Sequence, residues 1–440
     1  MRPTIQLQRA VLRISLAGLA GAALWLLSAA HRASARSAAN VSSYLFVWTG
    51  DGDRTASDLL VVIDADPRSK TYGHVVASAS TGISGGVPHH TEYEFPADGM
   101  LLANAWARSQ TFLFDLRQPT TPRIVASFQT AGPYAFPHSF VRMPNGHVLG
   151  TFQGKDAAYA PPGGLVEMDE RGTPLRTASA AGLGLADTLA WPYSLAIDAK
   201  HDRVVVTMTT MPIPAWLHAP AGSWRKSRAD SVMTSQVEIW SLSRLQLLHV
   251  LTLPAPAQNS SGPSGHTVNE FAAEPRLLPD GTMYVNTFTC GLYRLTGIDG
   301  AAPRAELAFE FPAAAGMYCA VPAVVGHFWI QTVPALPGLI ALDIRDPAHP
   351  VQVSRLTLPS RFGMPHWLAA DAKGSRVVLT GDDQGYVLVV DIDPRTGALV
   401  MDSTFRDERT GAVGVSLDGR TWPHGTIKRA FAHGALFGPR

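Results

Sequence analysis

Short apolar segments separated by polar turns run along nearly the whole chain. They recur as one unit: an apolar segment, a turn with Gly or Asp, a second apolar segment, a loop, an apolar run ending in Asp, and a charged tail. One copy, PHSFVRMPNGHVLGTFQG…GGLVEMDERG, begins at Pro137, and another begins at Pro192. Segments of this length and pattern predict β-strands, and no long amphipathic helix is predicted.

Further copies of the unit begin at Pro88, Glu274, Val321 and Gly363. The N-terminal SYLFVWTG…DLLVVIDAD carries the middle and outer strands of a unit but lacks its first strand, and the C-terminal WPHGTIKRAFAHGALFG resembles a first strand alone. A four-stranded unit that repeats every ~40–60 residues is typical of β-propellers. We therefore expect an all-β, seven-bladed β-propeller over residues 40–440, closed by joining the terminal strands, with six or eight blades as alternatives.

The first 35 residues have the plan of a secretory signal peptide. Arg2, Arg9 and Arg13 precede the apolar run ISLAGLAGAALWLLSAA, and the small-x-small sequence ASA follows it. This pattern predicts a cleaved signal over residues 1–35 and a periplasmic or secreted protein without stable membrane insertion. An uncleaved membrane anchor is the alternative, because the apolar run is long for a signal.

Composition narrows the class of protein. Apolar residues make up 46% of the chain and charged residues 16%, which indicates a well-packed globular protein. The net charge of +1 provides no basic surface, so we expect no nucleic-acid partner. Export would permit a disulfide between the two cysteines, Cys290 and Cys319, and the sequence leaves a bridge and two buried thiols equally open.

Four units begin with the dipeptide Pro-His. The histidines are His89, His138, His366 and His424, and His90 adds a fifth imidazole beside His89. Because the first strand of each blade lines the centre of a propeller, histidines at one point of four adjacent blades can converge. Several imidazoles without a thiolate favour copper, zinc, iron or nickel over calcium or magnesium. The sequence thus predicts a metal centre, and it does not decide the place of His433.

Two stretches also resemble a known family. The segment LLVVIDADPRSKTYGHVV and the following PHHTEYEFPADGMLLANAWARSQTFLFDLRQPTTPRIV are similar to the opening of the selenium-binding protein / methanethiol oxidase family. Members share an IDVDPxSxxY strand, a later HH and a DLxxPxxPxI strand. FPHSFVRMPNGHVLGTF and GMPHWLAADAKGSRVVLT resemble later blades of the same family, so the similarity is patchy but extends over most of residues 44–440.

The resemblance implies a seven-bladed propeller with a histidine-bound copper. It also implies oxidation of methanethiol by O₂ to formaldehyde, hydrogen sulfide and hydrogen peroxide. The HH corresponds to His89 and His90, and the other ligands correspond to His138, His366 and His424 by blade position. Animal members carry a cysteine soon after the HH, and HHTEYEF has none. Selenium binding is therefore not expected, and the chain fits a divergent bacterial-type member.

The leading hypothesis is an exported copper-dependent oxidase of a small thiol, with the thiol and O₂ as its small-molecule partners. Iron or zinc is an alternative metal. Glu92, two residues after His90, is expected on the same strand face, where it could orient a ligand, and Glu270 could act as a base. A non-catalytic propeller that binds a metal or a protein is one alternative, and an iron enzyme similar to carotenoid oxygenases is another.

Overall fold

The computed structural model describes residues 43–156, 158–211, 234–255, 268–313, 318–381 and 384–438. The expected signal segment, residues 1–35, lies outside these ranges. Within them the chain forms strands and three single-turn 3-10 helices, η1 (Trp106–Arg108), η2 (Asp187–Leu189) and η3 (Ala199–His201), and no α-helix. The described residues include no helix with the length and apolar character to cross a membrane.

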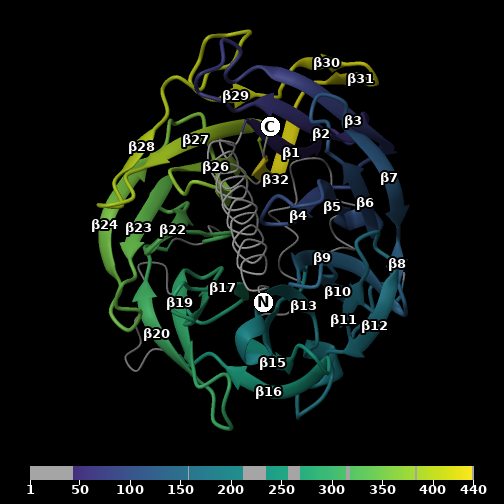
Figure 1. The fold of residues 1–440 in the computed structure, drawn as a ribbon, viewed down its shortest axis with the longest axis vertical. Helices are drawn as coiled ribbons and strands as arrows, with labels where there is room; N and C mark the ends of the chain where they lie inside the picture. The colour runs from purple at the N-terminus through teal and green to yellow at the C-terminus, as the bar shows by residue number, and fades with distance from the viewer. Residues whose placement is uncertain are drawn as a thin grey trace, which may run out of the picture.

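Seven antiparallel sheets of four or five described strands surround a central axis, so the predicted seven-bladed propeller is confirmed (Figure 1). One further, two-stranded sheet is separate from them. We number the sheets as blades 1 to 7 from the N-terminus. Blades 1 to 3 consist of β3 (Val75–Ser84), β2 (Ser57–Asp64), β1 (Tyr44–Asp51) and β32 (Ala430–Gly438); β4 (Pro88–Thr91), β5 (Met100–Ala105), β6 (Gln110–Asp115) and β7 (Arg123–Phe128); and β8 (Thr130–Ala131), β9 (Tyr134–Arg142), β10 (Val148–Gly154), β11 (Gly164–Met168) and β12 (Pro174–Ser179).

Blades 4 to 7 repeat this plan. They consist of β13 (Pro192–Asp198), β14 (Arg203–Met208), β15 (Gln236–Ser241) and β16 (Gln246–Thr252); β17 (Ala272–Leu277), β18 (Met283–Thr287), β19 (Gly291–Thr296) and β20 (Arg304–Glu310); β21 (Ala323–Val325), β22 (Phe328–Val333), β23 (Gly338–Asp343) and β24 (Val351–Thr357); and β25 (Pro365–Ala370), β26 (Arg376–Gly381), β27 (Tyr386–Ile392), β28 (Leu399–Met401) and β29 (Val415–Ser416).

The two ends of the chain close the ring in blade 1. β1 pairs with β32 in antiparallel register from Tyr44 opposite Gly438 to Asp51 opposite Ala430. The C-terminal strand thus provides the inner strand that the N-terminal segment lacks, as the repeat predicts. Closing the ring this way removes two unpaired sheet edges, which would otherwise be open to association with other chains.

Burial explains the hydrophobic pattern of the strands. The middle strands are buried on both faces, because each sheet packs between two neighbouring blades; the centre of β2 is the unbroken apolar run LLVVI. The outer strands alternate instead, and β7 runs exposed, half-buried, exposed along its length. The core therefore lies between the blades, and successive inner strands contact one another around the axis from β21 through β25, β32, β4, β9 and β13 to β17.

The position predicted for Pro423-His424 is wrong. The pair lies in the turn of a separate two-stranded hairpin formed by β30 (Arg420–Trp422) and β31 (Gly425–Ile427), where Trp422 pairs with Gly425. The inner strand of blade 1 begins only at Ala430. The sequence pattern failed here because an additional segment after blade 7 carries a Pro-His of its own.

Cys290 and Cys319 form a disulfide, with Cα atoms 5.1 Å apart. This decides between the bridge and the two buried thiols that the sequence left open. Cys290 follows β18 in blade 5, and Cys319 lies just before β21 in blade 6. The disulfide therefore joins two neighbouring blades near the axis.

Candidate metal centre

One hydrogen bond recurs in five blades and defines a layer of equivalent residues around the axis. In each blade, a Thr or Asn of the second strand accepts the backbone N–H of an inner-strand residue, at 2.9–3.2 Å. The residues whose N–H groups are bound are His90, Ser139, Ser194, Glu274 and Ala320. The residues that directly precede them are His89, His138, Tyr193, Ala273 and Cys319, which we call the site layer together with His366 and His433.

Four of these side chains, Asn104, Thr151, Thr207 and Asn286, also bind a carbonyl of the next blade, and Thr380 of blade 7 does the same. Asn104 donates to the carbonyls of Pro137 and His138 at 2.8 and 2.6 Å, while it accepts the N–H of His90. Thr380 donates to the carbonyl of His433. A buried backbone group without a partner is costly, so these bonds fix the histidine backbones relative to one another.

The inner strands are also irregular at this layer. The pairing register shifts between Pro88 and Thr91 in β4 and at the corresponding point of β9, β13, β17, β25 and β32. A β-bulge places two consecutive residues opposite one residue of the partner strand and redirects their side chains. This explains why His89 and His90, which would point to opposite faces of a regular strand, both reach the cluster.

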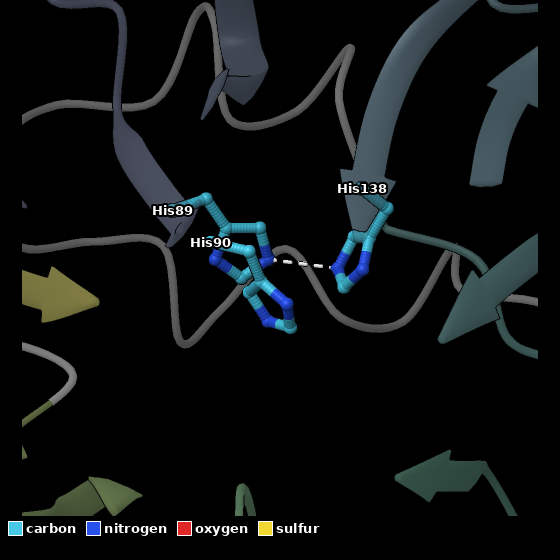
Figure 2. Close-up of side chains that lie close together, drawn as sticks. All are labelled: His89, His90 and His138. Carbon is cyan, nitrogen blue, oxygen red and sulfur yellow. Dashed lines mark hydrogen bonds between the residues drawn. The ribbon is translucent and has the colours of Figure 1, made fainter. Parts of the chain in front are cut away.

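Five histidines gather at the axis from four adjacent blades, 7, 1, 2 and 3. The Nε2 atoms of His89 and His138 lie 2.9 Å apart, and His89 Nδ1 lies 2.9 Å from His433 Nε2 (Figure 2 shows the first of these contacts). The ring of His366 lies 4.3 Å from that of His433, centroid to centroid. The potential ligand atoms of His89, His90 and His138 all lie within 4.8 Å of one another, so these three could hold a metal ion.

The structure thus brings together four of the five predicted ligands and separates the fifth. His89, His90, His138 and His366 are buried in the cluster, whereas His424 lies in the β30–β31 turn. His433 occupies the blade 1 position for which the sequence pattern indicated His424. Two contacts identify His433 as the blade 1 residue of this layer. Its carbonyl accepts a hydrogen bond from Thr380 in blade 7, and its strand, β32, pairs with β1 near the other end of the chain.

Gly434 follows His433 and allows the strands to approach closely here. A Cβ atom at this position would lie 3.0 Å from the carbonyl oxygen of His89 and 3.1 Å from the nitrogen of Thr91. Any larger residue would push β32 away from β4. Glycine therefore permits the short contact between the imidazoles of His433 and His89.

Among the described residues, neither of the predicted carboxylates, Glu92 and Glu270, forms a hydrogen bond with a histidine. Glu92 is buried, binds Arg142 Nε at 2.8 Å and accepts the N–H of Leu102 at 3.0 Å. Burial raises its pKa to about 7, against the opposing effect of Arg142. The bulge in β4 disrupts the alternation from which its orientation was predicted. Glu270 lies before β17, with its backbone N–H and carbonyl bound to Thr289.

The electrostatics of the cluster suit neutral imidazoles. Burial lowers the pKa of His89, His90 and His138 well below the ordinary value, and repulsion between the imidazoles lowers it further. Neutral imidazole is the form that binds a metal. His90 Nε2 is buried and has no hydrogen-bond partner among the described residues. A buried polar atom without a partner is unfavourable, so the residues present fit a metal such as copper, zinc or iron.

A polar network that the sequence did not reveal lies directly behind His90 and His138. Ser139 Oγ lies 3.0 Å from His90 Nδ1 and 3.1 Å from His138 Nδ1. The same oxygen lies 3.1 Å from the hydroxyl of Tyr93, which donates to Glu274 Oε2 at 2.7 Å. Ser194 and Glu274 occupy the position of His90 in their own blades. The equivalent positions are recognisable only once the blades are aligned by their Thr and Asn residues.

A cluster of apolar side chains, which we call the apolar cap, packs against the histidines on the side where the inner strands begin. Phe136, Trp191 and Met364 each precede a site-layer residue by two positions, and they form one buried cluster with Trp106 and Tyr159. The ring of Trp106 lies 6.3 Å from that of His89. The cap draws on blades 2, 3, 4 and 7, so it extends across the ring of inner strands. Buried apolar side chains therefore cover the histidines on this side.

The backbone is unusual at the same level. Val87, Phe136 and Phe271, each two residues before the site layer, have φ values of 58°, 58° and 55°. Left-handed conformations cost non-glycine residues about 1–3 kcal/mol each, and they concentrate at functional sites. Their recurrence in three blades shows that this turn into the inner strand belongs to the repeat.

Comparison with known proteins gives one sequence match of limited length. A stretch of 109 residues, 23% of this chain, is 38% identical to a methanethiol oxidase from Hyphomicrobium sp.. The chain matches about a quarter of that relative's length, 24%. No protein-family model matches the chain.

Comparison of folds gives wider coverage at low identity. A protein described as a hypothetical selenium-binding protein from Sulfolobus tokodaii superposes with a TM-score of 0.70, over 90% of this chain and 94% of the other, at 16% identity. The periplasmic gluconolactonase of Pseudomonas aeruginosa gives a TM-score of 0.55, over 81% and 94%, at 12% identity. At these identities the matches show the propeller fold and nothing finer. The sequence match of 109 residues supports the resemblance to methanethiol oxidases over that stretch.

Proposed function

We propose that this protein is an exported, copper-dependent oxidase of a small thiol. The observation that carries the proposal is the cluster of five buried imidazoles, with His90 Nε2 lacking a partner in the described chain. The methanethiol oxidase segment supports the reaction class. His89, His90, His138 and His433 would hold the metal, with His366 as a further ligand. When bound, copper would supply affinity for sulfur and redox chemistry toward O₂.

The proposed overall reaction is that of methanethiol oxidases: CH₃SH + O₂ + H₂O gives HCHO + H₂S + H₂O₂. The carbon loses two electrons and its C–S bond, and it gains its oxygen from water. O₂ takes up the two electrons and becomes hydrogen peroxide, while the sulfur leaves as hydrogen sulfide. The chain's own residues would provide dry, apolar surroundings through the cap and a fixed array of imidazoles.

Export has two supports. Residues 1–35 have the charge and hydropathy pattern of a signal peptide. The Cys290–Cys319 disulfide is of the kind that persists in oxidising compartments. N-terminal sequencing of protein recovered from the periplasmic fraction tests this part of the proposal. Cleavage near residue 35 is expected, and an intact N-terminus in the cytoplasmic fraction would contradict it.

The test of activity is O₂ uptake by the copper-loaded protein in a closed cell with methanethiol, with formaldehyde, sulfide and peroxide measured together. Equal amounts of the three products are expected, with His138→Ala at background. His424→Ala is the matched control, because it removes a Pro-His imidazole outside the cluster, and it should retain activity. Stoichiometric metal without O₂ uptake on any small thiol would favour the non-catalytic propeller, and stoichiometric iron would favour an oxygenase.

A further inference from the structure

The polar network behind the histidines begins at a carboxylate with several donors. Glu274 on β17 is fully buried, and its Oε2 accepts hydrogen bonds from Tyr93 OH and Ser194 Oγ, each at 2.7 Å, and from Arg276 Nη1 at 2.9 Å. The Arg276 guanidinium also lies 4.1 Å above the Tyr93 ring. The ion pair therefore fixes both the carboxylate and the tyrosine.

The carboxylate fixes the direction of the bonds that it receives, and proton counting limits the directions of the bonds beyond it. A carboxylate oxygen only accepts, so the single hydroxyl proton of Tyr93 is donated to Glu274. Tyr93 OH also lies 2.9 Å from Ser194 Oγ and 3.4 Å from His90 Nδ1, but the Ser194 proton is donated to Glu274. Ser139, at 3.1 Å, is then the neighbouring hydroxyl that can still donate to the tyrosine oxygen. Ser139 has only one hydroxyl proton, so its oxygen can only accept in its other contacts.

Those other contacts are the two imidazoles. Ser139 Oγ lies 3.0 Å from His90 Nδ1 and 3.1 Å from His138 Nδ1, and with Ser139 donating to Tyr93 each nitrogen carries the proton that it donates to the serine. A neutral imidazole has one N–H, so the Nε2 atoms of both rings are left bare.

We infer that Glu274, acting through Tyr93 and Ser139, sets the tautomers of His90 and His138 so that both present a bare Nε2 to the centre of the cluster. These three are positioning residues, because none of them faces the space between the imidazoles as a ligand. In this orientation His90 Nε2 is a bare, buried nitrogen without a partner among the described residues, and His138 Nε2 can accept from His89 Nε2 at 2.9 Å. Hydrogen bonds to the second nitrogen generally select which nitrogen of a histidine binds a metal.

The consequence for metal affinity rests on the proposed function, but the tautomers themselves can be measured without any metal. The direct experiment is ¹⁵N NMR of the metal-free protein, labelled selectively at histidine, because ring-nitrogen shifts distinguish an N–H from a bare nitrogen. Wild type should show both rings as Nδ1–H. In Tyr93→Phe, Ser139 loses the acceptor for its proton and donates to one imidazole, so that ring should change to Nε2–H.

Two further variants separate this effect from a general loss of packing. Tyr284→Phe removes another buried hydroxyl bond, to the carbonyl of Pro347 at 2.8 Å, away from the histidines, and should leave both rings unchanged. Glu274→Gln can still offer an amide oxygen to Tyr93, so it should keep both rings as Nδ1–H.

Competition with a chelator gives the second readout. Copper affinity should fall about 10–100-fold in Tyr93→Phe and remain unchanged in Tyr284→Phe. Wild-type rings found as Nε2–H, or rings that remain Nδ1–H in Tyr93→Phe, would overturn the inference. A wild type that binds no copper but shows both Nδ1–H rings, with the change in Tyr93→Phe, would overturn the proposed function and leave the inference standing.

Discussion

Asn104 offers the sharpest test of how the fold positions the histidines. Its side chain accepts the N–H of His90 and donates to the carbonyls of Pro137 and His138, all in the interior. Asn104→Ala would leave three buried backbone groups without partners. At the lower end of about 1–3 kcal/mol for each such group, the loss is about 3–5 kcal/mol.

This loss can be expressed as a melting temperature. An unfolding entropy of about 2.1 cal/mol/K per residue gives roughly 0.8 kcal/mol per degree for a chain of this size, so Asn104→Ala should melt about 4–6 °C lower. Copper affinity should fall as well, because the backbones of His90 and His138 lose their common restraint.

The chain itself offers the rescue variant. Thr151 and Thr207 occupy the same position in blades 3 and 4, where each accepts one N–H and donates to one carbonyl of the next blade. Asn104→Thr should therefore recover most of the lost stability and affinity. Scanning fluorimetry and chelator competition on the three proteins test this. A melting temperature for Asn104→Ala within 1 °C of wild type, or Asn104→Thr no better than Asn104→Ala, would refute the reasoning.

Three other predictions concern separate parts of the molecule. Burial raises the pKa of Glu238 to about 8, and the unfolded chain loses this proton at lower pH, so the stability of wild type should fall as pH rises. Urea unfolding should therefore show the stability of Glu238→Gln relative to wild type rising by about 3 kcal/mol between pH 5 and pH 7. A difference that stays constant with pH would contradict this. Cys290→Ser with Cys319→Ser opens a 29-residue loop and should cost about 3–4 kcal/mol, measured as a melting temperature about 4 °C lower; an unchanged value would refute it. Trp191→Ala opens the apolar cap, so the ratio of kcat/KM for methanethiol to kcat/KM for the charged thiol glutathione should fall about tenfold. The same ratio in the variant and in wild type would show that the cap does not determine selectivity.

The repeat and its closure could be predicted because they follow from strand periodicity. Each blade buries its middle strands and exposes its outer strand, so the apolar pattern recurs along the chain. The terminal strands complement each other for the same reason. Three of the four Pro-His histidines, His89, His138 and His366, could be placed because the dipeptide lies near the start of an inner strand.

The remaining parts of the site depend on geometry that a one-dimensional pattern does not contain. A bulge in β4 changes which residues share a face, so Glu92 points to Arg142 and His90 joins the cluster. His433 lacks the preceding proline, while His424 has it and lies in an added hairpin. The network from Glu274 to Ser139 joins residues from three blades, and no local spacing indicates it.

The most direct test of the metal centre is the metal content of the purified protein, measured by elemental analysis for wild type, His433→Ala and His424→Ala. The two variants remove one imidazole each, the first within the buried cluster and the second in the β30–β31 turn. Copper near one per chain is expected in wild type and in His424→Ala, with loss in His433→Ala. A wild type without metal after loading with copper, or copper lost in His424→Ala and retained in His433→Ala, would contradict the proposed centre.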